Sequence, residues 1–104
     1  MASKQRKAFE EFVERAEEEL GESLEKLVLY GSVARGEENE GSDVDVFAVV
    51  KEKSDKEVLE ELAFDVNVEF GVFMVPVVKT VEEFESVRDS IFVREVEKTG
   101  EAYV

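Results

Sequence analysis

The stretch LVLYGSVARGEENEGSDVDVFAVV, residues 27–50, decides how this chain folds. An apolar run, Lys26 to Tyr30, is typical of a short strand covered on both faces. It leads into Gly31-Ser32 and a polar segment whose length allows one helical turn and then a loop. A second apolar run, Asp43 to Val50, predicts a neighbouring strand. The two strand ends and the loop between them are therefore the place to look for a site.

The second strand carries two aspartates on one face. Asp43 and Asp45 are two residues apart, so their Cα atoms are separated by about 7 Å along an extended strand. Two carboxylates on one face repel each other, and neither is easily buried without a positive partner. Mg²⁺ meets this need, because it prefers one or two carboxylates together with phosphate oxygens and water. We therefore expect Asp43 and Asp45 to bind Mg²⁺.

The first strand ends in residues suited to a phosphate. Gly31 lets the backbone approach a ligand closely, and Ser32 offers a hydroxyl and an amide at the start of a helical turn. A phosphate-binding turn that faces a metal-binding carboxylate pair supplies the parts needed for phosphoryl or nucleotidyl transfer. Each half alone has an ordinary alternative. Gly-Ser is a common turn, and Asp-x-Asp is more often a strand start or a fragment of a calcium-like loop.

The remaining chain alternates helical and extended patterns. Apolar residues at helical spacing and capping residues predict helices and strands as follows: helices at 3–20, 54–70 with a Ser54–Glu57 capping box, 80–87 with a Thr80–Glu83 capping box, and 90–98; an edge strand at 72–78, which contains Pro76; and a short terminal strand within 101–104. In the second helix, Asp65, Asn67 and Glu69 are expected mostly on the solvent side. The order αβ(loop)βαβαα predicts an α/β (α+β) fold, a mixed sheet flanked by helices, in one domain spanning residues 1–104.

Composition excludes several kinds of function. The chain has no cysteine and no histidine, which rules out disulfides, the usual zinc sites and histidine-activated nucleophiles. A net charge of −14 repels a nucleic-acid polymer. The sequence has neither an apolar run long enough to cross a membrane nor the apolar centre of a secretory signal. We expect a cytoplasmic protein with no membrane association.

The two motifs together resemble the signature of a known superfamily. Gly31-Ser32, ten intervening residues and Asp43-x-Asp45 are similar to the pattern of the nucleotidyltransferases typified by DNA polymerase β, above all its minimal nucleotidyltransferase branch. The likeness extends through Ala34-Arg35-Gly36 and Ser42, and more loosely over the whole chain. It implies the nucleotidyltransferase fold and the use of Mg²⁺ with ATP or another nucleoside triphosphate.

The resemblance also implies roles for the residues that carry it. Gly31, Ser32, Arg35 and Ser42 would bind the nucleotide, and the two aspartates would be catalytic metal ligands. Arg35 has an alternative as a solvated loop residue or an ion-pair partner of Glu37 or Glu38.

One part of the superfamily pattern is missing. Its members usually take a third carboxylate from the next strand, but here that strand begins Val72-Phe73-Met74-Val75 and has no acid. Glu69 could serve as a third metal ligand only if this strand began earlier than predicted. Without a third acid, catalysis could be slow, or the acceptor could supply the base.

The resemblance implies a particular acceptor. Minimal nucleotidyltransferases are often encoded beside a helical HEPN-type toxin, and as antitoxins they adenylylate a tyrosine of that toxin. The expected function is thus Mg²⁺-dependent transfer of AMP from ATP to a hydroxyl of a partner protein. Two alternatives remain: a binding module of the same fold that neutralises a basic partner by contact, with weak or absent transfer, and a structural or nucleotide-sensing domain.

Overall fold

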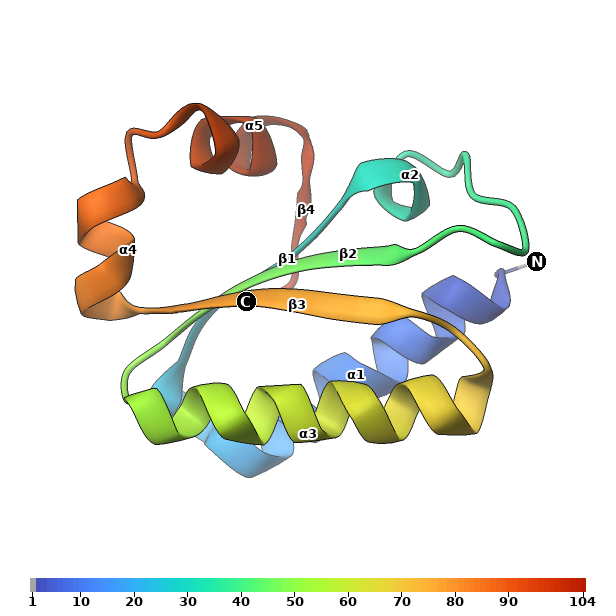
Figure 1. Cartoon of the computed structure of the whole chain (residues 1–104), viewed down its shortest axis with the longest axis horizontal. Coiled ribbons are helices and arrows are strands. Elements are labelled where there is room, and N and C mark those ends of the chain that lie inside the picture. The colour runs from blue at the N-terminus through green and yellow to red at the C-terminus, as the bar shows by residue number, and fades with distance from the viewer. Residues whose placement is uncertain (1) are drawn as a thin grey trace.

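Four strands form one mixed sheet in the order β3-β2-β1-β4 (Figure 1). The computed structural model describes residues 2–104, and its strands are Leu24–Tyr30 (β1), Val44–Val50 (β2), Met74–Thr80 (β3) and Glu101–Ala102 (β4). β1 is antiparallel to β2 and to β4, whereas β2 and β3 are parallel. The mixed sheet, the terminal strand and the edge position of Pro76 on β3 are confirmed.

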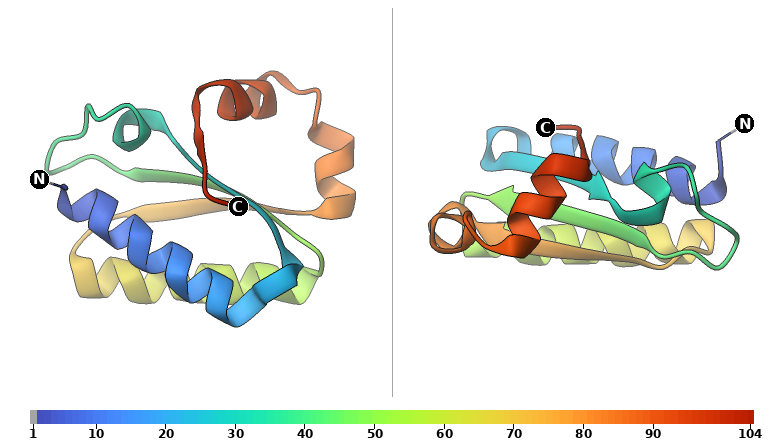
Figure 2. Two further views of the ribbon diagram at one scale, coloured as in Figure 1. Left: turned by 180° about the vertical axis from the view of Figure 1, so that it is seen from behind. Right: turned by 90° about the horizontal axis from the view of Figure 1, so that it is seen from above.

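Helices cover both faces of the sheet (Figure 2). They are Lys4–Leu20 (α1), the 3-10 helix Gly21–Ser23 (η1), Gly31–Ala34 (α2), Lys53–Phe70 (α3), Val81–Val87 (α4) and Ile91–Thr99 (α5). α1 and α3 lie side by side on one face, and α4 and α5 lie on the other. The short helix α2 directly continues β1, so it lies at the end of the sheet, between α5 and the loop that leads to β2.

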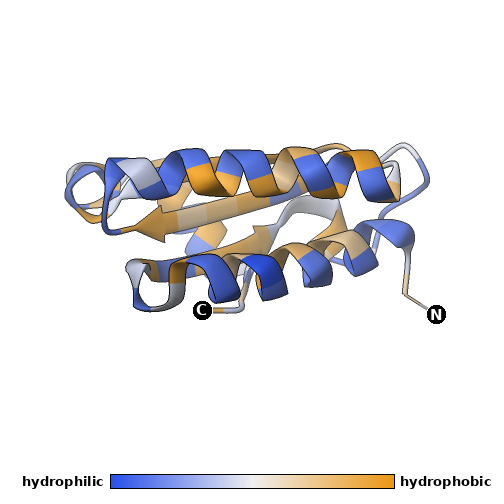
Figure 3. Ribbon diagram, turned by 90° about the horizontal axis from the view of Figure 1, so that it is seen from below, coloured by the Kyte–Doolittle hydropathy of each residue, from blue (hydrophilic) through white to orange (hydrophobic). Residues whose placement is uncertain are grey.

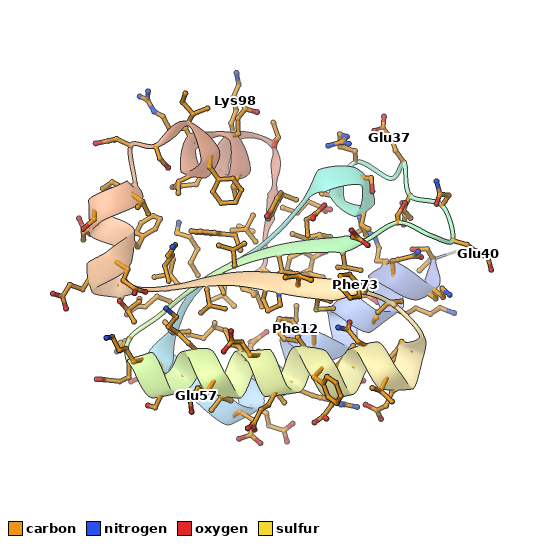
Figure 4. The ribbon with its side chains drawn as sticks, viewed as in Figure 1. Phe12, Glu37, Glu40, Glu57, Phe73 and Lys98 are labelled. Atoms are coloured by element: carbon orange, nitrogen blue, oxygen red, sulfur yellow. The ribbon has the colours of Figure 1, made fainter. Side chains whose placement is uncertain are left out.

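Alternating strand residues fill two separate cores. Val46 and Leu29 belong to the larger core, which packs against α1 and α3 and includes the buried Phe12 (Figure 4). Phe47 belongs to the smaller core under α4 and α5. The outer surfaces of α1 and α3 are mostly hydrophilic, while the strands behind them are mostly hydrophobic (Figure 3). Because side chains alternate along a strand, Asp45 lies on the same face as Phe47, towards α5.

The start of α3 differs from the prediction. The capping box is formed by Glu52 and Asp55, and not by Ser54 and Glu57. The Asp55 carboxylate accepts a hydrogen bond from the Glu52 backbone N–H at 2.9 Å, and Ser54 lies inside the helix. A carboxylate accepts a stronger hydrogen bond than a serine hydroxyl does and also interacts favourably with the helix N-terminus, which explains the earlier start.

The turn from α3 into β3 also differs. Asn67 was expected on the solvent side, but its side chain accepts a hydrogen bond from the Met74 N–H at 2.8 Å and donates one to the Met74 carbonyl at 3.0 Å. These two bonds satisfy the Met74 backbone groups, while Met74 also pairs with Val44 as the first residue of the β2–β3 ladder. The strand starts at Met74 and not at Val72.

Candidate nucleotide and metal site

Gly31-Ser32 lies where β1 ends and α2 begins. Gly31 has a φ of 78°, a left-handed conformation that glycine adopts at little cost and other residues do not. Tyr30 precedes it in the N-cap position and makes no side-chain hydrogen bond to the helix. Within residues 2–104, the first amides of α2 thus have no side-chain cap, and unpaired amides at a helix start suit an anion.

The second strand brings its aspartates to this turn. Tyr30 and Asp45 are directly paired residues of β1 and β2. Gly31 packs against the Asp45 side chain so closely that an added Cβ would overlap a carboxylate oxygen and would come within 3.0 Å of Cγ. Asp43 is exposed just before β2 begins at Val44. The structure therefore places the Gly-Ser turn and the Asp-x-Asp pair side by side, as the sequence predicts.

The electrostatics of this corner fit a cation. Burial raises the pKa of Asp45, and the negative charge of Asp43 raises it further, whereas Arg35 opposes the shift. The pKa of Tyr30 is also raised, first by burial and then by the charge of Asp45. A half-buried carboxylate whose ionised form is disfavoured by burial and by a neighbouring carboxylate is a donor that a divalent cation neutralises. The residues present therefore fit the metal that the fold family implies.

Arg35 and Ser42 have local roles in the loop between α2 and β2. The guanidinium of Arg35 forms an ion pair with Glu37 at 2.7 Å, the alternative considered from the sequence, although its charge still reaches Asp45. The Ser42 hydroxyl accepts a hydrogen bond from the Asn39 N–H at 2.9 Å and so shapes the loop. Figure 4 shows Glu37 on the outer side of this loop. Contact of Arg35 and Ser42 with a nucleotide stays a prediction.

Glu69 does not join the aspartates. It lies on the last turn of α3, on the opposite face of the sheet from Asp45, and its carboxylate pairs with Arg15 of α1 at 2.6 Å. The strand that would have carried it towards the site begins only at Met74. Among residues 2–104, no group of three or more acidic side chains is arranged to hold a metal. Glu69 as a third ligand is therefore wrong, and the site has two carboxylates.

The sequence matches the model of a known family over most of its length. Residues 6–99 match the Nucleotidyltransferase domain. The chain belongs to the nucleotidyltransferase family. It is similar to the Methanocaldococcus jannaschii protein named "Putative protein adenylyltransferase MJ0141", with 31% identity over 86 residues, 78% of this chain and 80% of the relative. As a family member, this nucleotidyltransferase is an enzyme that transfers a nucleotidyl group.

Solved structures share the fold of this nucleotidyltransferase. One is a toxin-antitoxin crystal structure with AMP-PNP, with a TM-score of 0.62 and 19% identity, covering 89% of this chain and 70% of the other. A mutant of the MntA-HpeT toxin-antitoxin matches with the same TM-score and coverage at 17% identity. At these identities the likeness establishes the fold, a mixed sheet flanked by helices.

Two residues that support the site were missed from the sequence. The buried Gln5 side chain donates hydrogen bonds to the carbonyls of Asn39 at 2.7 Å and Glu40 at 3.1 Å, and Arg6 donates to the Val33 carbonyl at 2.8 Å. These contacts fasten the site loop and α2 to α1. The sequence pattern predicts that a polar residue on an amphipathic helix faces solvent. The bonds of Gln5 and Arg6 to backbone carbonyls are therefore seen only in the three-dimensional structure.

None of the helices within residues 2–104 combines the length and hydropathy needed to cross a membrane.

Proposed function

We propose that this nucleotidyltransferase transfers AMP from ATP to a hydroxyl of a partner protein in the cytoplasm, with Mg²⁺ as its cofactor. The observation that carries the proposal is the packing of Gly31 against Asp45, since it joins a phosphate-binding turn to a metal-binding pair. One strand end supplies amides for the triphosphate, and the neighbouring strand supplies carboxylates for the metal.

The proposed reaction is an in-line displacement at the α-phosphorus. The acceptor hydroxyl oxygen forms a bond to this phosphorus, the bond to the oxygen that bridges to the β-phosphate breaks, and pyrophosphate leaves with the bonding electrons. Gly31 and Ser32 orient the phosphates, with Arg35 and Ser42 at the edge of the nucleotide. Asp43 and Asp45 would hold Mg²⁺, which would offset the charge of the phosphates and stabilise the charge that develops on their oxygens.

The hydroxyl proton needs an acceptor outside the aspartate pair. β3 runs beside β2 with the sequence MVPVVKT and carries no acid. Val75 is paired with Asp45, so we assign to this position the third carboxylate that the superfamily usually has and this chain lacks. We therefore assign the base to the acceptor protein: a basic group of that protein takes up the proton that its own hydroxyl loses as the oxygen bonds to phosphorus.

The similar proteins support ATP and a protein acceptor. The relative at 31% identity is named as a protein adenylyltransferase, which favours AMP as the transferred group and a protein as its acceptor. The toxin-antitoxin structure with AMP-PNP contains an ATP analogue and a partner protein. For this chain, the proposed partner is a helical HEPN-type protein.

Transfer of label from ATP tests the proposal. With ATP labelled on its α-phosphate, Mg²⁺ and candidate acceptor proteins, we expect the wild type to label the acceptor and the Asp43→Ala, Asp45→Ala variant to fail. Asp89→Ala is a matched control, because it removes an exposed aspartate outside the site. Equal labelling by the wild type and the double variant would reject the proposal.

A second candidate is a binding module that neutralises its partner by contact. The apolar β3 favours it, because a site without a third carboxylate would transfer slowly. The charge of −14 also favours it, because an acidic surface associates rapidly with a cationic partner. The double aspartate variant separates the two candidates in cells that carry the toxic partner. If the variant still binds and still protects the cells, contact is sufficient; if it binds without protecting, transfer is required.

A further inference from the structure

Large apolar side chains are exposed along the free edge of the sheet. Phe64 of α3 is 67% exposed, Phe73 is 61% exposed and Val75 of β3 is 54% exposed. Single exposed apolar residues are ordinary, but these three line the same open depression together with Pro76. We call these four residues the edge groove. Within residues 2–104, β3 pairs only with β2, so the groove follows the free side of an edge strand.

Acidic residues border the edge groove along α3. Glu57, Glu60, Glu61 and Asp65 line a second depression that also includes Phe64, and we call these four residues the acidic rim. Glu57 extends outward from α3 in Figure 4, and Phe73 lies near the start of β3. Within residues 2–104, no rim residue forms an ion pair, in contrast to the nearby Glu69.

The spacing of the rim makes its charges repel one another. Glu57, Glu61 and Asp65 follow at intervals of four residues, which brings successive carboxylates together on one face of the helix. Val68, which is 69% exposed, continues the apolar side of the surface beyond Phe64. The surface therefore combines an apolar strip with uncompensated negative charge.

The negative charge of this surface indicates which class of molecule can bind to it. A second copy of the chain would set two acidic rims against each other, and nucleic acids and anionic membranes are repelled in the same way. A protein segment with apolar side chains flanked by lysine or arginine satisfies both parts of the surface. Phe64 lies on the α3 side of the sheet, whereas Val75 is paired with Asp45 and lies on its face, so the edge groove crosses the free edge of β3 towards the site.

We propose that the edge groove and the acidic rim form the docking surface for a cationic, apolar segment of a partner protein. Resting on the proposed function, this inference identifies the segment as part of the acceptor, held so that a hydroxyl reaches the phosphate beside Asp45. The sequence features that select the partner are then lysines or arginines at the flanks of an apolar strip.

A synthetic peptide tests the docking surface without any transfer reaction. The probe is an amphipathic helical peptide of leucine and lysine, and its matched counterpart carries glutamate in place of every lysine. In NMR titrations of the full chain, we expect the lysine peptide to shift the resonances of Phe64, Val68, Phe73 and Val75 first. Phe64→Ser should weaken its binding about tenfold or more, as loss of an aromatic anchor does.

Ile91→Ser is the matched control, because Ile91 is an apolar side chain 84% exposed on α5, away from the groove. We expect it to leave peptide affinity unchanged. The proposal is overturned if shifts spread evenly over the acidic surface, if the glutamate peptide binds equally well, or if Ile91→Ser weakens binding as much as Phe64→Ser. A wild-type dimer that Phe64→Ser dissociates in sedimentation would also overturn it, because the occupant would be a second copy.

Titration with Mg²⁺ and ATP keeps the two proposals separate. Phe64→Ser should bind Mg²⁺ and ATP as the wild type does, since Phe64 lies on α3 and the aspartate pair lies at the start of β2. Loss of peptide binding with unchanged ATP binding supports the docking surface. Groove-specific peptide binding by a chain that binds no ATP also supports the docking surface and counts against the proposed function alone.

Discussion

Gly31 joins the two halves of the candidate site through its missing side chain. It satisfies two demands at once: a left-handed backbone at the end of β1 and room for the Asp45 carboxylate. Gly36, in the following loop, has a similar φ of 71° but nothing within 4 Å of its Cβ position. Substitutions at the two glycines therefore distinguish the free-energy cost of the left-handed backbone from the cost of crowding the Asp45 carboxylate.

Gly31→Ala should lower the affinity for Mg²⁺ with ATP about 10 to 100-fold, a loss typical of displaced metal-site geometry. Gly36→Ala carries the same backbone penalty of about 1 to 2 kcal/mol but leaves Asp45 in place, so its affinity should stay near that of the wild type. Calorimetric titration and urea denaturation measure both quantities. Equal affinity losses in the two variants would show that backbone strain, and not contact with Asp45, is responsible.

Val75 is the position to which we assign the missing third carboxylate. It faces the same side of the sheet as Asp45 and is its partner in the parallel ladder. Val75→Asp should add a third carboxylate and raise the affinity for Mg²⁺ or Mn²⁺ about tenfold, equivalent to about 1.4 kcal/mol. Val75→Asn, which has the same shape without the charge, is the control. If both variants bind the cation as weakly as the wild type, position 75 does not reach the metal.

At the scale of elements, the hydrophobic pattern predicted more than the polar contacts did. Amphipathic spacing predicted α1 and α3, and alternation in β2 placed Asp45 on the correct face. The roles of Gln5 and Asn67 were not predictable, because each binds backbone groups that only the fold brings near. Periodicity reports which side of an element is buried, and it does not report which buried backbone atoms need a partner.

The site was predictable to the same extent. Gly31-Ser32 and Asp43-x-Asp45 lie at strand ends that the sequence identifies, so their meeting follows from pairing β1 with β2. The position of Glu69 depended on where α3 ends and β3 begins, and a helix and a strand can compete for the same few residues. Asn67 of α3 bonds to Met74 at the start of β3, a contact that only the fold shows.

The capping box of α4 should make a pH-dependent contribution to the stability of the fold. The Glu83 carboxylate accepts hydrogen bonds from the Thr80 N–H at 2.9 Å and from the Lys56 ammonium at 3.0 Å. The Thr80 bond first, and Lys56 second, hold the pKa of Glu83 below its ordinary value of 4.5. Because the folded-state pKa is lowered, this stabilisation is present above the ordinary value and is lost as the pH falls through the folded-state pKa.

Glu83→Gln should therefore be less stable than the wild type at neutral pH, and the difference should shrink as the pH falls below 4.5. Urea denaturation from pH 7 to pH 3 measures this difference. Glu82→Gln is the control, since Glu82 lies in the same first turn outside the capping box. A Glu83→Gln deficit that stays constant at every pH would mean that the carboxylate charge contributes nothing.

At the scale of the whole molecule, negative charge is in excess. Asp and Glu number 27 against 13 Lys and Arg, so most acids have no cation to pair with. Self-repulsion of this kind opposes the compact state while it speeds association with cationic surfaces. In the acidic rim this repulsion acts along one face of α3, where it lowers the stability of the fold. On the docking proposal, the same charges attract the cationic partner.

Neutralising part of the acidic rim should raise the stability of the fold and lower the affinity for a cationic partner. The variant Glu57→Gln, Glu61→Gln, Asp65→Asn removes two repulsive pairs at four-residue spacing, and should gain about 0.4 to 1 kcal/mol at low ionic strength. The gain should shrink as KCl screens the charges, and affinity for the lysine peptide should fall in the same variant. Glu85→Gln is the control, because Glu85 is paired with Arg88 at 2.9 Å and removing its charge should not raise the stability of the fold.

Urea denaturation at low and high KCl measures the stability of each variant. A rim variant no more stable than the wild type at low salt would show that these carboxylates already avoid one another, and the uncompensated charge would then no longer be an argument for a cationic partner.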